Sequence, residues 1–163
     1  MATTSVPAST DRRDAATAPT WVVWTTLPLA VVGLAAATYL TITHFDAHAL
    51  VCSKGIFNCA AVTTSAESKF LGVIPVAFLG LFQYVCMTAL CTPWAWRSQR
   101  REVHLARLAF AAVGIAFVLW LLVAELLIIK AICEYCTIVH VVTFGLFVCV
   151  VSTAPSMLGW NER

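Results

Sequence analysis

The chain has 163 residues, of which 61% are hydrophobic and only 11% are charged. A soluble domain would carry roughly twice that share of charged residues, so the composition excludes an ordinary soluble protein and indicates an integral membrane protein small enough to form one bundle of helices. The net charge of +2 is too small to indicate nucleic-acid binding, and despite seven cysteines the apolar content is too high for a secreted disulfide scaffold.

The N-terminal part of the chain contains a polar tail and two apolar stretches. Residues 1–20 are small and polar without hydrophobic periodicity, so we expect a disordered tail there. The first membrane span is expected at about Trp21–Thr43. The second is expected at about Phe70–Cys91, with Pro75 in its first turn, where a helix tolerates proline.

The C-terminal part, from Leu105 to Ser152, is almost continuously apolar. As one helix it would be roughly 70 Å long, more than twice the thickness of the hydrocarbon core, so it must fold back once. The only polar interruption is the segment KAICEYC. We therefore expect a third span at about Leu105–Ile129, a turn near Lys130–Ile132 and a fourth span at about Cys133–Ser152, with a short tail over residues 153–163. The expected fold class is an all-α membrane domain of four helices over residues 21–152.

Basic residues predict how these spans are oriented. The loop between the second and third spans has the densest basic cluster near any helix end: Arg97, Arg100 and Arg101, with Arg107 just after. The positive-inside rule makes this loop cytoplasmic, and both termini with it. The long loop between the first two spans and the KAICEYC turn then share the extracytoplasmic side.

This orientation places two cysteine pairs on the same face of the membrane. Cys52 and Cys59 lie in the long loop, and Cys133 and Cys136 form a CxxC at the start of the fourth span. A cysteine at a helix N-terminus is stabilised as a thiolate by the helix dipole and the free N–H groups. The two pairs together favour thiol–disulfide exchange. A structural disulfide, a soft-metal site and chance occurrence stay open as alternatives for the CxxC.

The other three cysteines are expected to lie deeper in the bundle and to act as small packing residues: Cys86, Cys91 and Cys149.

The segment CSKGIFNCAAVTTSAESKFLGVIPVAFLG, Cys52–Gly80, followed later by AICEYC, resembles the vitamin K epoxide reductase family, and in particular its bacterial members that form disulfides. The similarity includes a cysteine pair with six residues between, a serine six residues after the second cysteine (Ser65), the GVIPVAFLG opening of the second helix, and the CxxC at the head of the fourth. It covers about Trp21–Ser152. Each feature is unspecific alone, but the combination is specific.

The resemblance implies a four-helix bundle around a membrane quinone, either menaquinone or ubiquinone. Cys133 and Cys136 would form the active-site disulfide, with Cys136 as the thiolate that faces the quinone. Cys52 and Cys59 would be a shuttle pair, in which Cys52 meets the partner's thiol and Cys59 exchanges with Cys133. Many bacterial members carry a fused thioredoxin-like domain after the bundle. This chain stops at Arg163, so we expect a separate extracytoplasmic thioredoxin-fold partner.

The resemblance implicates two further residues, Ser65 and His140, and the sequence itself adds Glu125. Ser65 would lie near the quinone on a short helix formed by AAVTTSAES, or would only make a local backbone hydrogen bond. His140 stands where vertebrate members carry an aromatic hydroxyl residue that touches the naphthoquinone. It would bind a quinone carbonyl, move protons, or simply bond to a neighbouring helix backbone, and it leaves epoxide reduction in doubt. Glu125, an ionisable residue inside a span, would relay protons or pair with a polar group.

Two other functions stay open. The same electron path would serve a quinone or quinone-epoxide reductase whose purpose is to supply hydroquinone. A membrane protein that binds a soft metal through cysteine and histidine ligands is an alternative of a different class.

Overall fold

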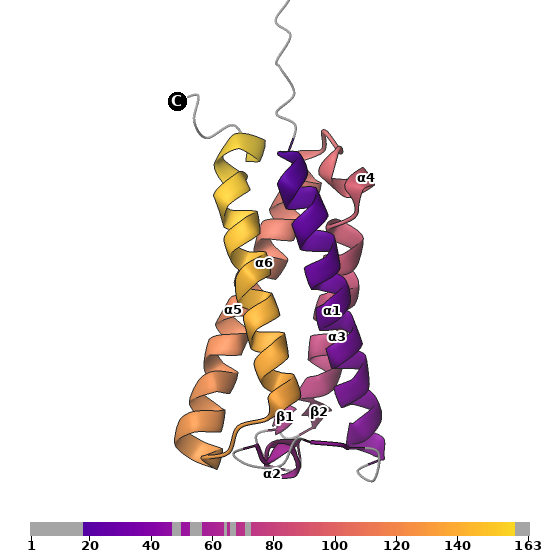
Figure 1. Ribbon diagram of the computed structural model, residues 1–163. Coiled ribbons are helices and arrows are strands. Elements are labelled where there is room, and N and C mark those ends of the chain that lie inside the picture. The colour runs from indigo at the N-terminus through magenta and orange to yellow at the C-terminus, as the bar shows by residue number, and fades with distance from the viewer. Residues whose placement is uncertain are drawn as a thin grey trace, which may run out of the picture.

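The computed structural model describes residues 18–46, 50–52, 57–63, 65, 68–70 and 73–158, without the side chain of Phe70. Within these residues the chain is mostly helical (Figure 1). Its elements are α1 (Thr20–Phe45), α2 (Cys59–Thr63), β1 (Lys69–Phe70), β2 (Ile74–Pro75), α3 (Val76–Leu90), α4 (Pro93–Trp96), α5 (Arg101–Val123), the π-helical segment η3 (Ala124–Ile129) and α6 (Glu134–Leu158).

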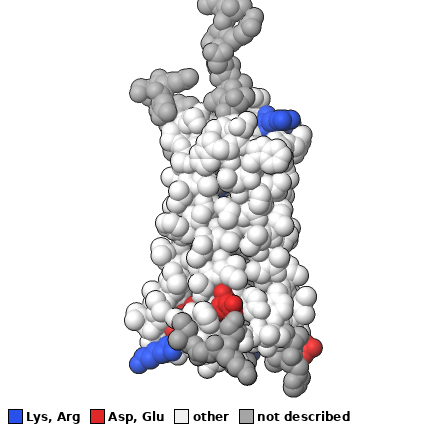
Figure 2. Space-filling view, viewed as in Figure 1, with Lys and Arg blue, Asp and Glu red and all other residues white. Residues whose placement is uncertain are grey.

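Four helices pack side by side. The helix α1 contacts α3 and α6, and α5 contacts the same two helices (Figure 1). Among the described residues, three segments are long and apolar enough to cross a membrane: α1, α5 continued by η3, and α6. The charged residues on the face shown in Figure 2 gather at the two ends of the molecule, and the shaft between them is uncharged. The expectation of an all-α membrane protein is therefore confirmed.

The second expected span is shorter than the sequence suggested, and its predicted start at Phe70 is wrong. Lys69 pairs with Pro75, and Phe70 with Ile74, in a two-stranded antiparallel sheet. The helix α3 begins only at Val76, with Pro75 as its N-cap residue. A proline forces the residue before it into an extended conformation, so Ile74 cannot continue a helix through Pro75.

The two ends of the molecule hold different helices and strands. The helix α1 begins, and α6 ends, at the end that also holds α4 (Figure 1). The opposite end holds α2, β1, β2 and the connection between η3 and α6. The expected tails lie mainly outside the described residues, and α6 continues beyond the expected limit at Ser152 as far as Leu158.

Arg107 is not a surface charge, although the sequence counts it beside the basic loop. Its side chain is only 1% exposed. The guanidinium group donates two hydrogen bonds to the carbonyl oxygen of Leu90, at 2.9 and 2.7 Å, and lies 3.5 Å from the centre of the Trp96 ring. It therefore satisfies a carbonyl at the C-terminal end of α3, and the exposed basic cluster is reduced to the three arginines that precede it.

Candidate redox site

A short backbone pairing connects the long loop to the start of α6. Phe57 and Ile132 form an isolated parallel bridge, and the N–H of Asn58 donates to the carbonyl oxygen of Ile132 at 2.9 Å. The residues that follow this pairing are Cys59, the first residue of α2, and Cys133, the residue before α6. Two cysteines far apart in the sequence are therefore placed side by side by their backbones.

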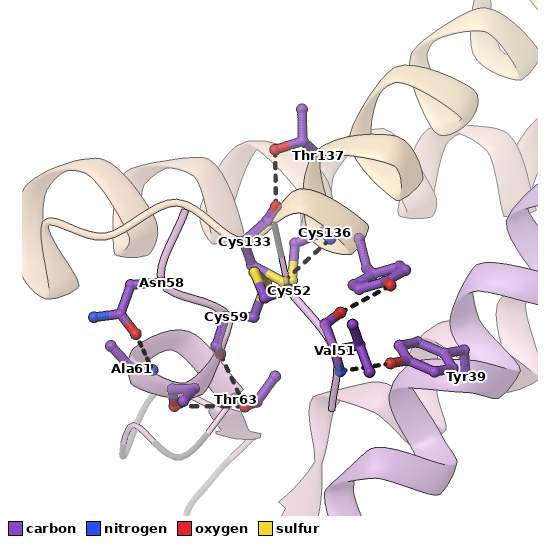
Figure 3. The surroundings of a disulfide bond; sticks show 12 residues. Tyr39, Val51, Cys52, Asn58, Cys59, Ala61, Thr63, Cys133, Cys136 and Thr137 are labelled. Carbon is purple, nitrogen blue, oxygen red and sulfur yellow. Dashed lines mark hydrogen bonds between the residues drawn. A yellow bond between two sulfur atoms is a disulfide. The ribbon is translucent and has the colours of Figure 1, made fainter. Parts of the chain in front are cut away.

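The two cysteine pairs meet in one buried cluster (Figure 3). Cys59 is 1% exposed and Cys133 is fully buried, whereas Cys52 and Cys136 are partly exposed and pack against the cluster. Cys52 and Cys59 form a disulfide, and Cys133 and Cys136 are free thiols. The two pairs therefore pack together at one end of the bundle.

The sulfur of Cys133 occupies a helix-capping position. It accepts the backbone N–H of Cys136 at 3.4 Å, and the N–H of Thr137 donates to the Cys133 carbonyl oxygen at 2.9 Å. The hydrogen bond from the Cys136 side chain lowers the pKa of Cys133, helped by the backbone N–H and opposed by burial. Cys133 is therefore the thiol of this pair that is poised to react as a thiolate.

The π-helical segment η3 directs an acidic side chain into the bundle. Lys130 ends this segment in the left-handed conformation, with φ 54°, and the N–H groups of Lys130 and Ala131 both bond to the carbonyl oxygen of Glu125. The Glu125 side chain is 5% exposed and lines the same cavity as Cys136. Such π-helical turns are frequent at functional sites, and this one places a buried carboxyl group in the wall of that cavity.

A cavity of about 380 Å³ lies among the helices, within the size range of small-molecule sites, which is about 300–1,000 Å³. Most of its lining is apolar. Four residues singled out from the sequence line it together: Cys136, His140, Glu125 and Ser65. Cys52, Cys59 and Cys133 do not line it. The CEYC pair therefore stands between the loop disulfide and the cavity.

His140 is the most unusual of these lining residues. It is only 6% exposed, and within the described part of the chain neither ring nitrogen has a hydrogen-bond partner. A buried polar group without a partner costs about 1–3 kcal/mol. The alternative that His140 bonds to a neighbouring helix backbone is therefore not seen, and the ring is available to a ligand.

Ser65 shows the local hydrogen bond that was the alternative to ligand binding. Its hydroxyl group donates to the carbonyl oxygen of Val62 at 2.8 Å. The hydroxyl oxygen keeps the capacity to accept a hydrogen bond, and the residue still lines the cavity. The short helix expected in the segment after Cys59 is present only as α2, Cys59–Thr63, so Ser65 lies beyond the end of this helix and not on it.

Other polar residues of the cavity wall were not singled out from the sequence, among them Ser68 and Gln83. Gln83 donates from Nε2 to the carbonyl oxygen of Phe110 at 2.7 Å and so bridges α3 to α5. A polar side chain inside an apolar span is the signal that could have identified it. Within the described residues, no group of three or more histidine, cysteine, aspartate or glutamate side chains is placed to hold a metal ion.

The model of the vitamin K epoxide reductase family matches residues 24–151, a stretch that includes both cysteine pairs and most of the cavity. No curated protein sequence matches the chain significantly. Membership of this family implies redox activity in a membrane, and the family generally uses quinones. The chain therefore belongs to the vitamin K epoxide reductase family and is a membrane oxidoreductase.

Proposed function

We propose that the protein oxidises the dithiol of a separate extracytoplasmic thioredoxin-fold partner and passes the electrons to a membrane quinone. The electrons would go first to Cys52–Cys59, then to Cys133–Cys136, and finally to the quinone in the cavity. The observation that carries this proposal is the position of the CEYC pair: Cys133 packs against Cys59, and Cys136 lines the cavity.

The first exchange would oxidise the partner. A partner thiolate attacks the sulfur of Cys52, the more accessible member of the loop disulfide, and Cys59 leaves as a thiolate. The partner's second thiolate then attacks the partner sulfur of this mixed disulfide and frees Cys52. The partner leaves with a new disulfide, and the loop pair holds two more electrons.

The second exchange would move these electrons to the CEYC pair. The Cys59 thiolate attacks Cys133 of an oxidised CEYC disulfide, and Cys136 leaves as a thiolate. The Cys52 thiolate then attacks Cys59, and Cys133 leaves. The loop disulfide re-forms and the CEYC pair is reduced, which is the distribution of bonds in the structure: a Cys52–Cys59 disulfide beside two free thiols.

The cavity residues fit the headgroup of a quinone, whether menaquinone or ubiquinone. The apolar wall suits a flat ring, and the unpartnered nitrogens of His140 suit a carbonyl oxygen. Ser65 would offer its hydroxyl oxygen, and Glu125 would take the proton of the Cys136 thiol. When bound, the quinone would accept the two electrons and two protons that oxidation of the dithiol releases.

We also propose that all four packed helices span the membrane, with both termini cytoplasmic and both cysteine pairs outside. The helix α3 has 15 residues and is about 22 Å long, shorter than the hydrocarbon core of about 30 Å. It is included among the spans because it packs along α1 and α5 as the fourth helix of the bundle. The exposed arginines of the loop before α5 lie at the end where α1 begins and α6 ends, which supports a cytoplasmic position for that end.

Thiol trapping on intact membranes tests the proposed electron path. Free thiols are alkylated and each cysteine is mapped by mass spectrometry, first with the native quinone present and then after its depletion. We expect the Cys133–Cys136 disulfide to be present with quinone and reduced without it, while Cys86, Cys91 and Cys149 stay free throughout. If both pairs ignore the quinone, the proposed function is wrong.

A further inference from the structure

Val51, the residue before Cys52, has both of its backbone polar groups bonded to tyrosine side chains. Its N–H donates to the hydroxyl oxygen of Tyr39 at 2.9 Å (Figure 3). Its carbonyl oxygen accepts from the hydroxyl of Tyr135, also at 2.9 Å. The two tyrosine rings lie 4.5 Å apart between centroids, at 42°. The two tyrosines thus hold Val51 by both of its backbone polar groups.

The two tyrosines come from different helices. Tyr39 lies in the last part of α1, and Tyr135 lies in α6 between the two cysteines of the CEYC motif. The side chain of Val51 is 71% exposed, so burial contributes little to holding this residue in place. The backbone next to Cys52 is therefore tied to the active-site motif chiefly by hydroxyl groups.

We propose that Tyr39 and Tyr135 are positioning residues that hold Cys52 within reach of Cys59. This inference rests on the proposed function, in which the last step of the internal exchange is the attack of the Cys52 thiolate on Cys59. In that step the Cys59–Cys133 bond breaks, the Cys52–Cys59 bond forms and Cys133 leaves as a thiolate. Holding Val51 favours this closed loop disulfide over the Cys59–Cys133 bond.

The Cys136→Ser protein makes the competition between these two bonds measurable without any partner protein. It keeps Cys52, Cys59 and Cys133, and with one disulfide among them the protein exchanges between the Cys52–Cys59 and Cys59–Cys133 forms. The ratio of the two forms is obtained by rapid acid quenching, alkylation and mass spectrometry of the cross-linked peptides. No electron donor or acceptor is consumed, because Cys52 and Cys133 only trade places as thiol and disulfide partner.

Tyr39→Phe and Tyr135→Phe, each added to Cys136→Ser, remove one hydroxyl group and keep the ring contact. We expect each to raise the proportion of the Cys59–Cys133 form about three- to tenfold relative to the loop disulfide, the factor that one hydrogen bond typically contributes. Thr38→Val is the matched control, because it removes an exposed hydroxyl one residue away that bonds only within α1. It should leave the ratio unchanged.

The possible failures are distinguishable. If the Cys59–Cys133 form appears in the Cys136→Ser protein but its proportion is the same in both tyrosine variants, the positioning role is wrong and the relay stands. If that form appears in none of the proteins, the relay through Cys59 and Cys133 is wrong, and the positioning role fails with it.

Discussion

The N–H of Asn58 donates to the carbonyl oxygen of Ile132, and the next residue on each side is a redox cysteine. A single backbone pairing thus aligns Cys59 with Cys133 across two segments that the chain brings together from its first loop and its last helix. Because the pairing uses backbone groups, it needs no covalent bond between these two cysteines, and none joins them in the structure.

Replacement of Cys52 by serine should abolish activity with a protein electron donor and preserve activity with a small dithiol. Cys52→Ser removes the sulfur that a protein partner would attack, so oxidation of a reduced thioredoxin should be abolished. A small dithiol such as dithiothreitol can reduce the Cys133–Cys136 pair directly, and quinone reduction with it should continue. The check is quinone reduction by absorbance with each donor. Equal loss with both donors would contradict the shuttle role of Cys52.

The matching variant Cys133→Ser should lose activity with both donors, because no disulfide can then form at the CEYC motif. Cys86→Ser serves as the control for cysteine removal as such, since Cys86 is a free cysteine outside both pairs.

The lowered pKa of Cys133 predicts how its alkylation depends on pH. A depressed pKa means that the thiolate persists as the pH falls through the ordinary thiol range, so reduced Cys133 should react with iodoacetamide at pH values where an ordinary thiol has stopped reacting. Cys136→Ala removes the side-chain hydrogen bond that is the main cause of the lowered pKa of Cys133. The midpoint of the alkylation rate should therefore shift to higher pH in that variant, and an unchanged midpoint would show that another group lowers the pKa.

Gly33 should be essential for the packing of α1 on α3. A Cβ atom at this position would overlap the ring of Tyr84. Tyr84 is 2% exposed and its hydroxyl donates to the carbonyl oxygen of Val139 at 2.9 Å, so the ring cannot move aside easily. Gly33→Ala should destabilise the protein by about 1–3 kcal/mol. Gly80→Ala is the control, because nothing lies within 4 Å of its added Cβ, and thermal unfolding in detergent should leave it near wild type.

Much of the architecture could be predicted from hydropathy alone. The turn near Lys130 follows from the length of an apolar stretch that no single span can contain, and the structure ends η3 and begins α6 on either side of it. The start of α3 was predicted wrongly because apolar content does not distinguish a strand from a helix over a few residues. The local effect of Pro75 decided the outcome instead.

The site was less accessible to sequence reasoning than the fold. Spacing identified Cys133 and Cys136 as a pair. Only the family resemblance paired Cys59 with Cys133, because the backbone bridge beside them leaves no pattern in the sequence. The hydroxyl groups of Tyr39 and Tyr135 also escaped notice, because their target is the backbone of Val51 rather than a side chain.

Glu125 should act in the step between Cys136 and the quinone and nowhere earlier. Its carboxyl group lines the same cavity as the Cys136 thiol, so Glu125→Gln removes the group that would take the thiol proton and keeps the shape of the side chain. General-base removal typically costs about 10²–10⁴-fold, and we expect at least the lower figure for reoxidation of the reduced CEYC pair by a short-chain quinone. Glu125→Asp should recover part of the rate.

Two comparisons make the Glu125 result specific. Glu134→Gln is the same substitution at the glutamate of the CEYC motif, which does not line the cavity. This variant should leave the reoxidation rate near wild type. The exchange between Cys59 and Cys133 in the Cys136→Ser background should be unaffected by Glu125→Gln. A slow exchange in that background would instead indicate a structural role for the carboxyl group.

His140→Phe should weaken quinone binding without destabilising the protein. Neither ring nitrogen has a partner among the described residues, so an apolar ring of similar size removes a buried polar cost and should leave the melting temperature unchanged or raised. Loss of a hydrogen bond to a carbonyl should raise KM for the quinone about three- to tenfold. His104→Phe is the contrasting variant. The ring nitrogen Nε2 of His104 lies 2.8 Å from the Ser98 carbonyl oxygen, and its Nδ1 lies 3.0 Å from the Arg107 guanidinium group. Loss of these contacts should destabilise the protein by about 1–3 kcal/mol. If His140→Phe instead lowered the melting temperature as much as His104→Phe and left KM unchanged, the histidine would belong to the framework of the bundle and not to the quinone site.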